Sequence, residues 1–432
     1  MYGPCSATEK RLTRAARSRH MHAHSIDTRT PDSAPANAGM PATSLTEARH
    51  VNRASQFSIL VFAAVTWSLG AQAELPAEKL SVVTLPPANP HRLYLTDAAL
   101  NHVIDSRVHI VDGANMKYLG MISTGLSGIT TLSHDSSEML VATTYYTKRN
   151  RGDRFDQLEA YSTKDLSLKA EISIPPKHAM ALPYKGTIAP SVDGRYVMIQ
   201  NATPLSSVTV VDRKAGKVTS EVPTPGCWIV LPAQSNPSRF ATLCGDGTLV
   251  TVTLDKDGKP ASQQRSTKLF DAEKDPLFVQ GERVGDLYTF VSYEGTIHEI
   301  NVGGETAKTE ATWSLLDDAD RKAAWKPGGY QPLALHAATK QLYVAMHDAG
   351  RDGSHKRPAK EIWAFDLANK KRVARAPGSG AIAIALSKEV EPKLFAYDGI
   401  NMAYVRYDTT PALKPVATSK ALGEFVGLLE TH

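Results

Sequence analysis

The spacing of two cysteines, Cys227 and Cys244, would allow them to form a disulfide bond. They flank two apolar runs, 228–231 and 240–243, which are separated by the turn sequence Asn-Pro-Ser at 236–238. Residues at the base of an antiparallel pair face each other at roughly 5 Å, the separation that a disulfide needs. The stretch therefore predicts a hairpin closed by a Cys227–Cys244 bridge, which would place the chain in an oxidising compartment. The alternative is two buried free thiols.

Few other residues could take part in catalysis or metal binding. His347, Asp348 and His355 lie in one polar stretch and could form a metal or acid/base pair, although exposed loop histidines are the favoured interpretation. The sequence DKDG at 255–258 lacks the spacing of a calcium loop and predicts a hairpin turn. Dinucleotide, P-loop, zinc-protease, C-x-x-C and nucleophile-elbow motifs do not occur in the sequence. We therefore expect no catalytic residue and no metal site in this chain.

The N-terminal region has the parts of a secretory signal in order. Arg49 and Arg53 precede the apolar run 57–69, and Ala-Gln-Ala follows at 71–73. The run is shorter than the ~20 residues that span a bilayer, so we expect a cleaved signal within a leader of residues 1–73 and a mature chain from Glu74. Residues 1–39 show no apolar period, which suggests a translation start at Met40. Secretion across a membrane follows from this interpretation.

The charge of the chain excludes one class of partner. The formal net charge is +5, but residues 1–73 hold 8 Lys and Arg against 4 Asp and Glu, which leaves +1 for residues 74–432. Basic and acidic residues are interspersed without long runs. Nucleic acid and anionic membrane surfaces are therefore not expected partners.

Residues 74–432 repeat one pattern, an alternating strand that ends in a polar turn. Seven copies end at the following anchor residues: Asp112, Ser162, Asp212, Asp255, Asn301, Asp366 and Asp408. The intervals are 50, 50, 43, 46, 65 and 42 residues, the size of a four-stranded propeller blade. Apolar strands lie upstream of the anchors, as at 191–201, 281–293 and 336–347. The sequence predicts an all-β fold, a single seven-bladed β-propeller of four-stranded antiparallel blades.

The long interval predicts an insertion. Residues 314–324 have the pattern of a short helix capped by Ser314, and a long polar loop follows at 347–361. Trp363 is expected in the core, and Trp325 is expected to pack, with an interface anchor as the alternative. Either 79–85 or 424–429 would complete a blade begun at the other end of the chain.

Three long segments, 226–266, 313–330 and 353–378, carry a family resemblance that runs from about residue 90 to the C-terminus. They resemble the large (alpha, heavy) subunit of the quinoprotein amine dehydrogenases, and aromatic amine dehydrogenase in particular. The resemblance implies a periplasmic seven-bladed propeller paired with a small cysteine-rich beta subunit in an α2β2 assembly. That partner would carry tryptophan tryptophylquinone and the catalytic base. The enzyme would oxidise primary amines to aldehyde and ammonia and pass electrons to a cupredoxin such as azurin.

The same resemblance implies a role for Leu100. The family's large subunit lines one wall of the substrate channel with an aromatic residue, and residues 95–112 place Leu100 at that position, without a ring. The alternative is an ordinary loop residue. Two other functions remain open, a stand-alone periplasmic propeller for binding or scaffolding, and a propeller hydrolase or lactonase with a metal in its central channel.

Overall fold

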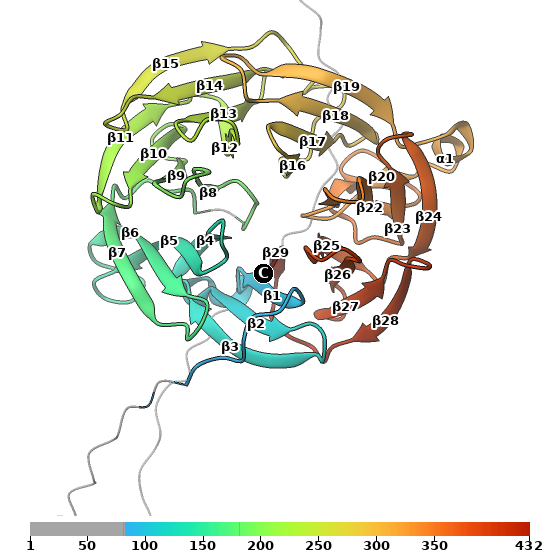
Figure 1. The fold of residues 1–432 in the computed structure, drawn as a ribbon, viewed down its shortest axis with the longest axis horizontal. Helices are drawn as coiled ribbons and strands as arrows, with labels where there is room; N and C mark the ends of the chain where they lie inside the picture. Colours follow the sequence, from blue (N-terminus) through green and yellow to red (C-terminus); the bar gives the residue numbers. More distant parts are fainter. Residues whose placement is uncertain (1–80, 82, 181) are drawn as a thin grey trace, which may run out of the picture. The chain divides into compact units, whose positions relative to one another are not determined.

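The computed structural model describes residue 81, residues 83–180 and residues 182–432. The predicted leader 1–73, the possible start at Met40 and the predicted first mature residue Glu74 lie outside this part of the chain. The described chain is almost entirely β-structure, folded into seven antiparallel sheets that follow one another around a ring (Figure 1). This confirms the predicted seven-bladed propeller.

Each blade runs from a strand at the central axis to a strand at the rim (Figure 1). The innermost strands are β29 (Val426–Thr431), β4 (Leu126–Leu132), β8 (Ile188–Pro190), β12 (Cys227–Pro232), β16 (Glu282–Val284), β20 (Lys326–Pro327) with β21 (Leu333–His336), and β25 (Ala381–Leu386). The second strands are β1 (Arg92–Asp97), β5 (Glu138–Tyr146), β9 (Tyr196–Asn201), β13 (Arg239–Cys244), β17 (Leu287–Val291), β22 (Gln341–His347) and β26 (Lys393–Asp398). The third strands are β2 (Arg107–Asp112), β6 (Arg154–Ser162), β10 (Ser207–Asp212), β14 (Leu249–Leu254), β18 (Thr296–Asn301), β23 (Glu361–Asp366) and β27 (Ala403–Asp408). The outermost strands are β3 (Lys117–Ser123), β7 (Leu168–Ile174), β11 (Lys217–Pro223), β15 (Pro260–Arg265), β19 (Lys308–Ser314), β24 (Lys371–Pro377) and β28 (Lys414–Thr418).

The repeated sequence pattern corresponds to the third strand of every blade. Six of these strands end on the predicted anchor residue itself, and β14 ends one residue before Asp255. Third strands are covered by neighbouring blades on both faces, so their side chains are largely buried. Outermost strands carry more exposed residues, and all six residues of β15 are exposed. Burial on both faces gives the third strands their apolar, β-branched composition, which makes them the detectable element.

The ring closes through the C-terminal strand. β29 pairs antiparallel with β1, with Leu93 opposite Thr431 and Asp97 opposite Val426. Of the two candidate closing segments, 424–429 is therefore the one that completes the first blade. Residues 79–85 form no strand among the residues described.

The core lies between the blades. The described residues form seven clusters of buried apolar side chains, and each cluster joins residues of two neighbouring blades. Because every blade shares both of its faces, no blade can bury its apolar surface alone. This interdependence makes the seven sheets one cooperative unit.

The predicted insertion is present, with one correction. The helix α1 (Asp318–Lys322) follows β19, and its N-cap is Asp317, whose side chain accepts a hydrogen bond from the Asp320 N–H. The predicted cap, Ser314, is wrong, because Ser314 is the last residue of β19. Beyond α1, the innermost position of the sixth blade is shared by β20 and β21, which both pair with β22.

In the described part of the chain, none of the helices combines the length and apolar character needed to cross a membrane.

Candidate functional site

Leu100 begins a short 3-10 helix, η1 (Leu100–Asp105), in the connection from β1 to β2. Ala99 precedes the helix with a φ of 44°, a left-handed conformation that turns the chain out of β1. Leu100 is 49% exposed, whereas Ala99 is fully buried. The sequence-predicted channel residue therefore lies at the surface, on a segment whose backbone is fixed from beneath.

The buried carboxylate of Asp97 fixes this segment. Its Oδ1 accepts hydrogen bonds from the Ala99 N–H at 2.9 Å and the Phe425 N–H at 2.8 Å. Its Oδ2 accepts from the Glu424 N–H at 2.9 Å and lies 3.3 Å from Nε2 of His109. Burial alone would raise the pKa of Asp97, but the hydrogen bonds from His109 and the three backbone N–H groups outweigh it and hold the pKa at about 2. Asp97 thus joins η1 to the segment that leads into β29.

A second contact joins the same two segments from the outside. Oε1 of Glu424 lies 2.8 Å from Nδ1 of His102, and Oε2 of Glu424 accepts from the Asn101 N–H at 3.3 Å. The His102 contact, followed by the Asn101 N–H, lowers the pKa of Glu424. The first turn of η1 is therefore held by two acidic residues with different burial, Asp97 below it and Glu424 at its edge.

This arrangement leaves apolar side chains at the surface. Leu100, Val103 and Ile104 are 49%, 41% and 46% exposed, although they are three of only six residues in η1. Met402 is also 40% exposed, and its carbonyl accepts from the N–H of Leu422, two residues before the Glu424 that contacts η1. We call Leu100, Val103, Ile104 and Met402 the η1 surface. Clustered exposed apolar side chains are typical of a surface that another molecule covers.

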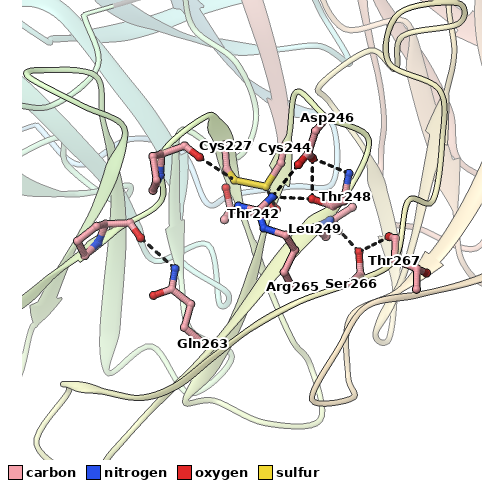
Figure 2. Close-up of a disulfide and its surroundings, with 12 residues drawn as sticks. Cys227, Thr242, Cys244, Asp246, Thr248, Leu249, Gln263, Arg265, Ser266 and Thr267 are labelled. Atoms are coloured by element: carbon pink, nitrogen blue, oxygen red, sulfur yellow. Dashed lines mark hydrogen bonds and ion pairs between the residues drawn. A yellow bond between two sulfur atoms is a disulfide. The ribbon is translucent and has the colours of Figure 1, made fainter. Parts of the chain in front are cut away.

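The disulfide lies elsewhere, in the fourth blade. Cys227 begins β12 and Cys244 ends β13, the two residues are opposite each other in register, and their sulfurs are joined at 2.02 Å (Figure 2). Both are buried. Beside them, Asp246 accepts from the side chain of Thr248 at 2.6 Å and pairs with Arg265 at 3.0 Å, which ties the following turn to β15 (Figure 2). The hairpin is a structural closure of the blade and adds no acid/base group to the η1 surface.

The histidines of the long loop differ from expectation. His347 is not an exposed loop residue, because it is the last residue of β22 and only 3% of it is exposed. Its Nδ1 donates to the Asp348 carbonyl at 3.0 Å, while His355 stacks on the ring of Tyr293 at 4.2 Å. Within the described ranges, no group of three or more His, Cys, Asp or Glu side chains could hold a metal ion.

The tryptophans of the sixth blade pack as expected. Trp363 is completely buried, and the ring of Trp325 lies 5.1 Å from it and is 8% exposed. Trp325 is therefore a packing residue of the core cluster between the fifth and sixth blades.

One feature was missed by sequence reasoning, a cavity of about 530 Å³ on the propeller axis. Residues of all seven blades line it, including Lys185, Arg283, His336, Lys388 and Glu430. The sequence interpretation could place no carboxylates or histidines in the channel. These carboxylates and histidines come from different blades, so only the closed ring brings them together.

Comparison with known proteins gives a consistent result. The methylamine dehydrogenase heavy chain (MADH) family matches residues 89–423. The methylamine dehydrogenase heavy chain of Methylophilus methylotrophus is 28% identical over 322 residues, which are 74% of this chain and 78% of the relative. The heavy chain of Methylorubrum extorquens is 25% identical over 368 residues, 83% of this chain and 88% of the relative.

Solved structures share the fold at much lower identity. A functionally unknown protein from Desulfotomaculum acetoxidans superposes with a TM-score of 0.53 at 12% identity, covering 79% of this chain and 98% of that one. This likeness supports the propeller alone. The family match, by contrast, extends from the first blade nearly to the closing strand, and on that basis the chain belongs to the methylamine dehydrogenase heavy chain family.

Proposed function

We propose that this chain is the non-catalytic large subunit of a periplasmic amine dehydrogenase. It would pair with a small cysteine-rich beta subunit in an α2β2 assembly and supply the scaffold, a substrate-channel wall and the docking surface. The observation that carries the proposal is the family match over residues 89–423 together with the exposed apolar η1 surface. The family match supports an amine dehydrogenase subunit, and the η1 surface offers a place where a partner can bury apolar area.

The tryptophan tryptophylquinone cofactor is assigned to the partner. When bound, such a quinone accepts two electrons from a primary amine, which leaves as aldehyde and ammonia after reaction with water. In this chain, Trp363 and Trp325 are packing residues of the core, which is compatible with an accessory role. A cupredoxin such as azurin is the proposed electron acceptor.

Leu100 is proposed as the channel wall, and the substrates as primary, aromatic amines. Its side chain is half-exposed and its backbone is held by Asp97 through the neighbouring Ala99, so its position is defined before a partner binds. A preorganised apolar wall orders a bound substrate at low entropic cost. Because Leu lacks a ring, its side chain would leave room for a bulky substrate group.

A pair of charge insertions tests the docking surface. Val103→Glu should place a carboxylate in the partner interface and reduce recovery of the small subunit at least tenfold, because an unpaired charge is costly to bury. The matched control is Val390→Glu, since Val390 is 82% exposed and lies between β25 and β26, in a connection at the opposite end of the blades. For each variant, co-purification measures the recovery of the small subunit, and an amine-dependent dye-reduction assay then measures activity. Equal recovery of the small subunit with both variants would exclude η1 as the docking surface.

A further inference from the structure

The axial cavity and the η1 surface lie at opposite ends of the propeller. The cavity is lined by the carboxyl ends of the innermost strands, among them Leu429, Glu430 and Thr431 of β29. β1 runs antiparallel to β29, so that Leu93 is beside Thr431 and Asp97 is beside Val426. Leu100 follows Asp97 in the chain and therefore lies at the end of the propeller opposite the cavity. The cavity has no part in the function proposed above and needs its own explanation.

The cavity contains more basic than acidic charge. Of its three basic side chains, Lys185 is neutralised by Glu282, to which its Nζ donates at 2.7 Å. Arg283 donates from Nη1 to the Pro232 carbonyl at 3.2 Å, and Nζ of Lys388 donates to the Ser136 hydroxyl at 3.4 Å. Among the described residues, neither Arg283 nor Lys388 has a carboxylate within ion-pair distance. Two basic side chains thus line the described cavity without a carboxylate partner.

The remaining acid, Glu430, contributes little opposing charge. Its Oε1 accepts from the Thr131 hydroxyl at 3.2 Å and the Leu132 N–H at 3.3 Å, while its buried Oε2 has no partner in the described structure. Burial raises the pKa of Glu430, which favours the protonated carboxyl, whose O–H is a donor. Burial, followed by the charge of Arg283, lowers the pKa of His134 and favours its neutral form. Burial thus disfavours the charged forms of Glu430 and His134, and it also lowers the pKa of Lys388, which leaves Arg283 as the firmly charged group without a carboxylate partner in the described part of the cavity.

The walls are rigid enough to form a site before a ligand arrives. The Gln331 side chain donates to the Leu429 carbonyl at 3.0 Å and accepts from the Leu429 N–H at 2.8 Å, which links the sixth blade to β29 across the ring. Tyr288 donates to the same Pro232 carbonyl as Arg283, at 3.0 Å. A preformed cavity of this size, lined by apolar side chains and by several convergent polar groups, is typical of small-molecule sites.

We propose that the axial cavity binds a small anion carrying a carboxylate or phosphate group, with Arg283 and Lys388 as its principal ligands. The guanidinium of Arg283 keeps N–H donors free for a bidentate contact with such a group. Burial lowers the pKa of Lys388, so an anion beside its Nζ would stabilise the charged form. Protonation of Glu430, which its burial favours, would make the unpartnered Oε2 a further donor.

Calorimetric titration of the isolated protein, with any accompanying subunit, tests the proposal. The probes are inorganic phosphate and malonate, each titrated at low ionic strength, and sodium chloride at matched ionic strength is the control. We expect saturable one-site binding of phosphate, malonate or both, which identifies the anion chemistry, and no saturable binding of chloride. Absence of saturable binding for both probes would overturn the proposal.

Variants connect the binding to the cavity. Arg283→Gln and Lys388→Gln should each weaken the bound probe at least tenfold, while Lys256→Gln, whose side chain is 88% exposed on a hairpin at the rim, should leave it unchanged. Circular dichroism melting shows whether each variant is folded. If Arg283→Gln does not fold, Lys388→Gln still tests the proposal, because the Lys388 Nζ makes a single weak contact in the described structure. Unchanged affinity in a folded Arg283 or Lys388 variant would show that the anion binds elsewhere and would refute the assignment.

Discussion

Asp97→Asn is the substitution that best tests how the η1 surface is held. The carboxylate accepts three backbone N–H bonds and one from His109. An amide retains one acceptor oxygen, so the Glu424 N–H would face an NH2 group and lose its partner. Leaving a buried donor unsatisfied costs about 1–3 kcal/mol.

The pKa of Asp97 gives an independent estimate of how much its carboxylate contributes to the free energy of unfolding. A folded-state pKa of about 2 against the ordinary 3.8 corresponds to about 2 kcal/mol of stability. Because the folded pKa is lowered, this contribution is complete above pH 3.8 and is lost as the pH falls towards 2. Both estimates agree on about 2 kcal/mol at pH 7.

Urea unfolding of the wild type and Asp97→Asn at pH 7, 5, 4 and 3 measures this contribution. The control is Asp105→Asn on the same loop, because Asp105 is 53% exposed and pairs only with Arg107, so its removal should change stability by less than about 0.5 kcal/mol. The reasoning would be refuted by an Asp97→Asn effect no larger than that of the control. It would also be refuted by an effect that stays constant from pH 7 to pH 3.

Three further predictions concern the other sites. Leu100→Phe should shift the ratio of kcat/KM for bulky aromatic over short aliphatic amines by a few-fold, measured by dye reduction, and an unchanged ratio would remove Leu100 from the channel. Replacing Cys227 and Cys244 together by Ser should lower the free energy of unfolding in urea by roughly 3 kcal/mol, because the bridge closes a loop of 17 residues in the unfolded chain. Thiol titration of the unfolded, unreduced wild type should find no free cysteine at 227 or 244. Glu430→Gln should stabilise the protein more at pH 8 than at pH 4, because the raised pKa of Glu430 makes the wild type lose stability as the pH rises through that pKa; identical pH profiles in thermal melts would contradict this.

The propeller could be predicted because its blades repeat a local signal. Third strands such as β10 and β23 are covered on both faces, and their apolar alternation ending in a polar turn is visible within ten residues. Trp363 was placed in the core by its position in such a strand. The sequence did not reveal which segment closes the ring. The pairing of β29 with β1 joins residues from opposite ends of the propeller sequence, and such a contact leaves no local pattern.

The candidate site could be predicted only in part, because its contacts are non-local. The sequence resemblance singled out Leu100, whose channel role stays a prediction. It could not reveal the contact of Asp97 with the Glu424 N–H, because these residues are 327 positions apart. The same limit explains the two errors. Ser314 has a capping residue type but is used by β19, and His347 lies in a polar stretch but is buried by the fold. Local composition could not show which neighbours the ring would bring to these residues.

Purification of the protein from periplasm under mild conditions tests the central proposal most directly. We predict that a small cysteine-rich subunit with quinone absorbance is recovered with this chain in equal amounts, and that amine-dependent dye reduction is found only in fractions that contain both. Recovery of this chain without any such partner, or amine-dependent reduction by this chain alone, would contradict the proposal.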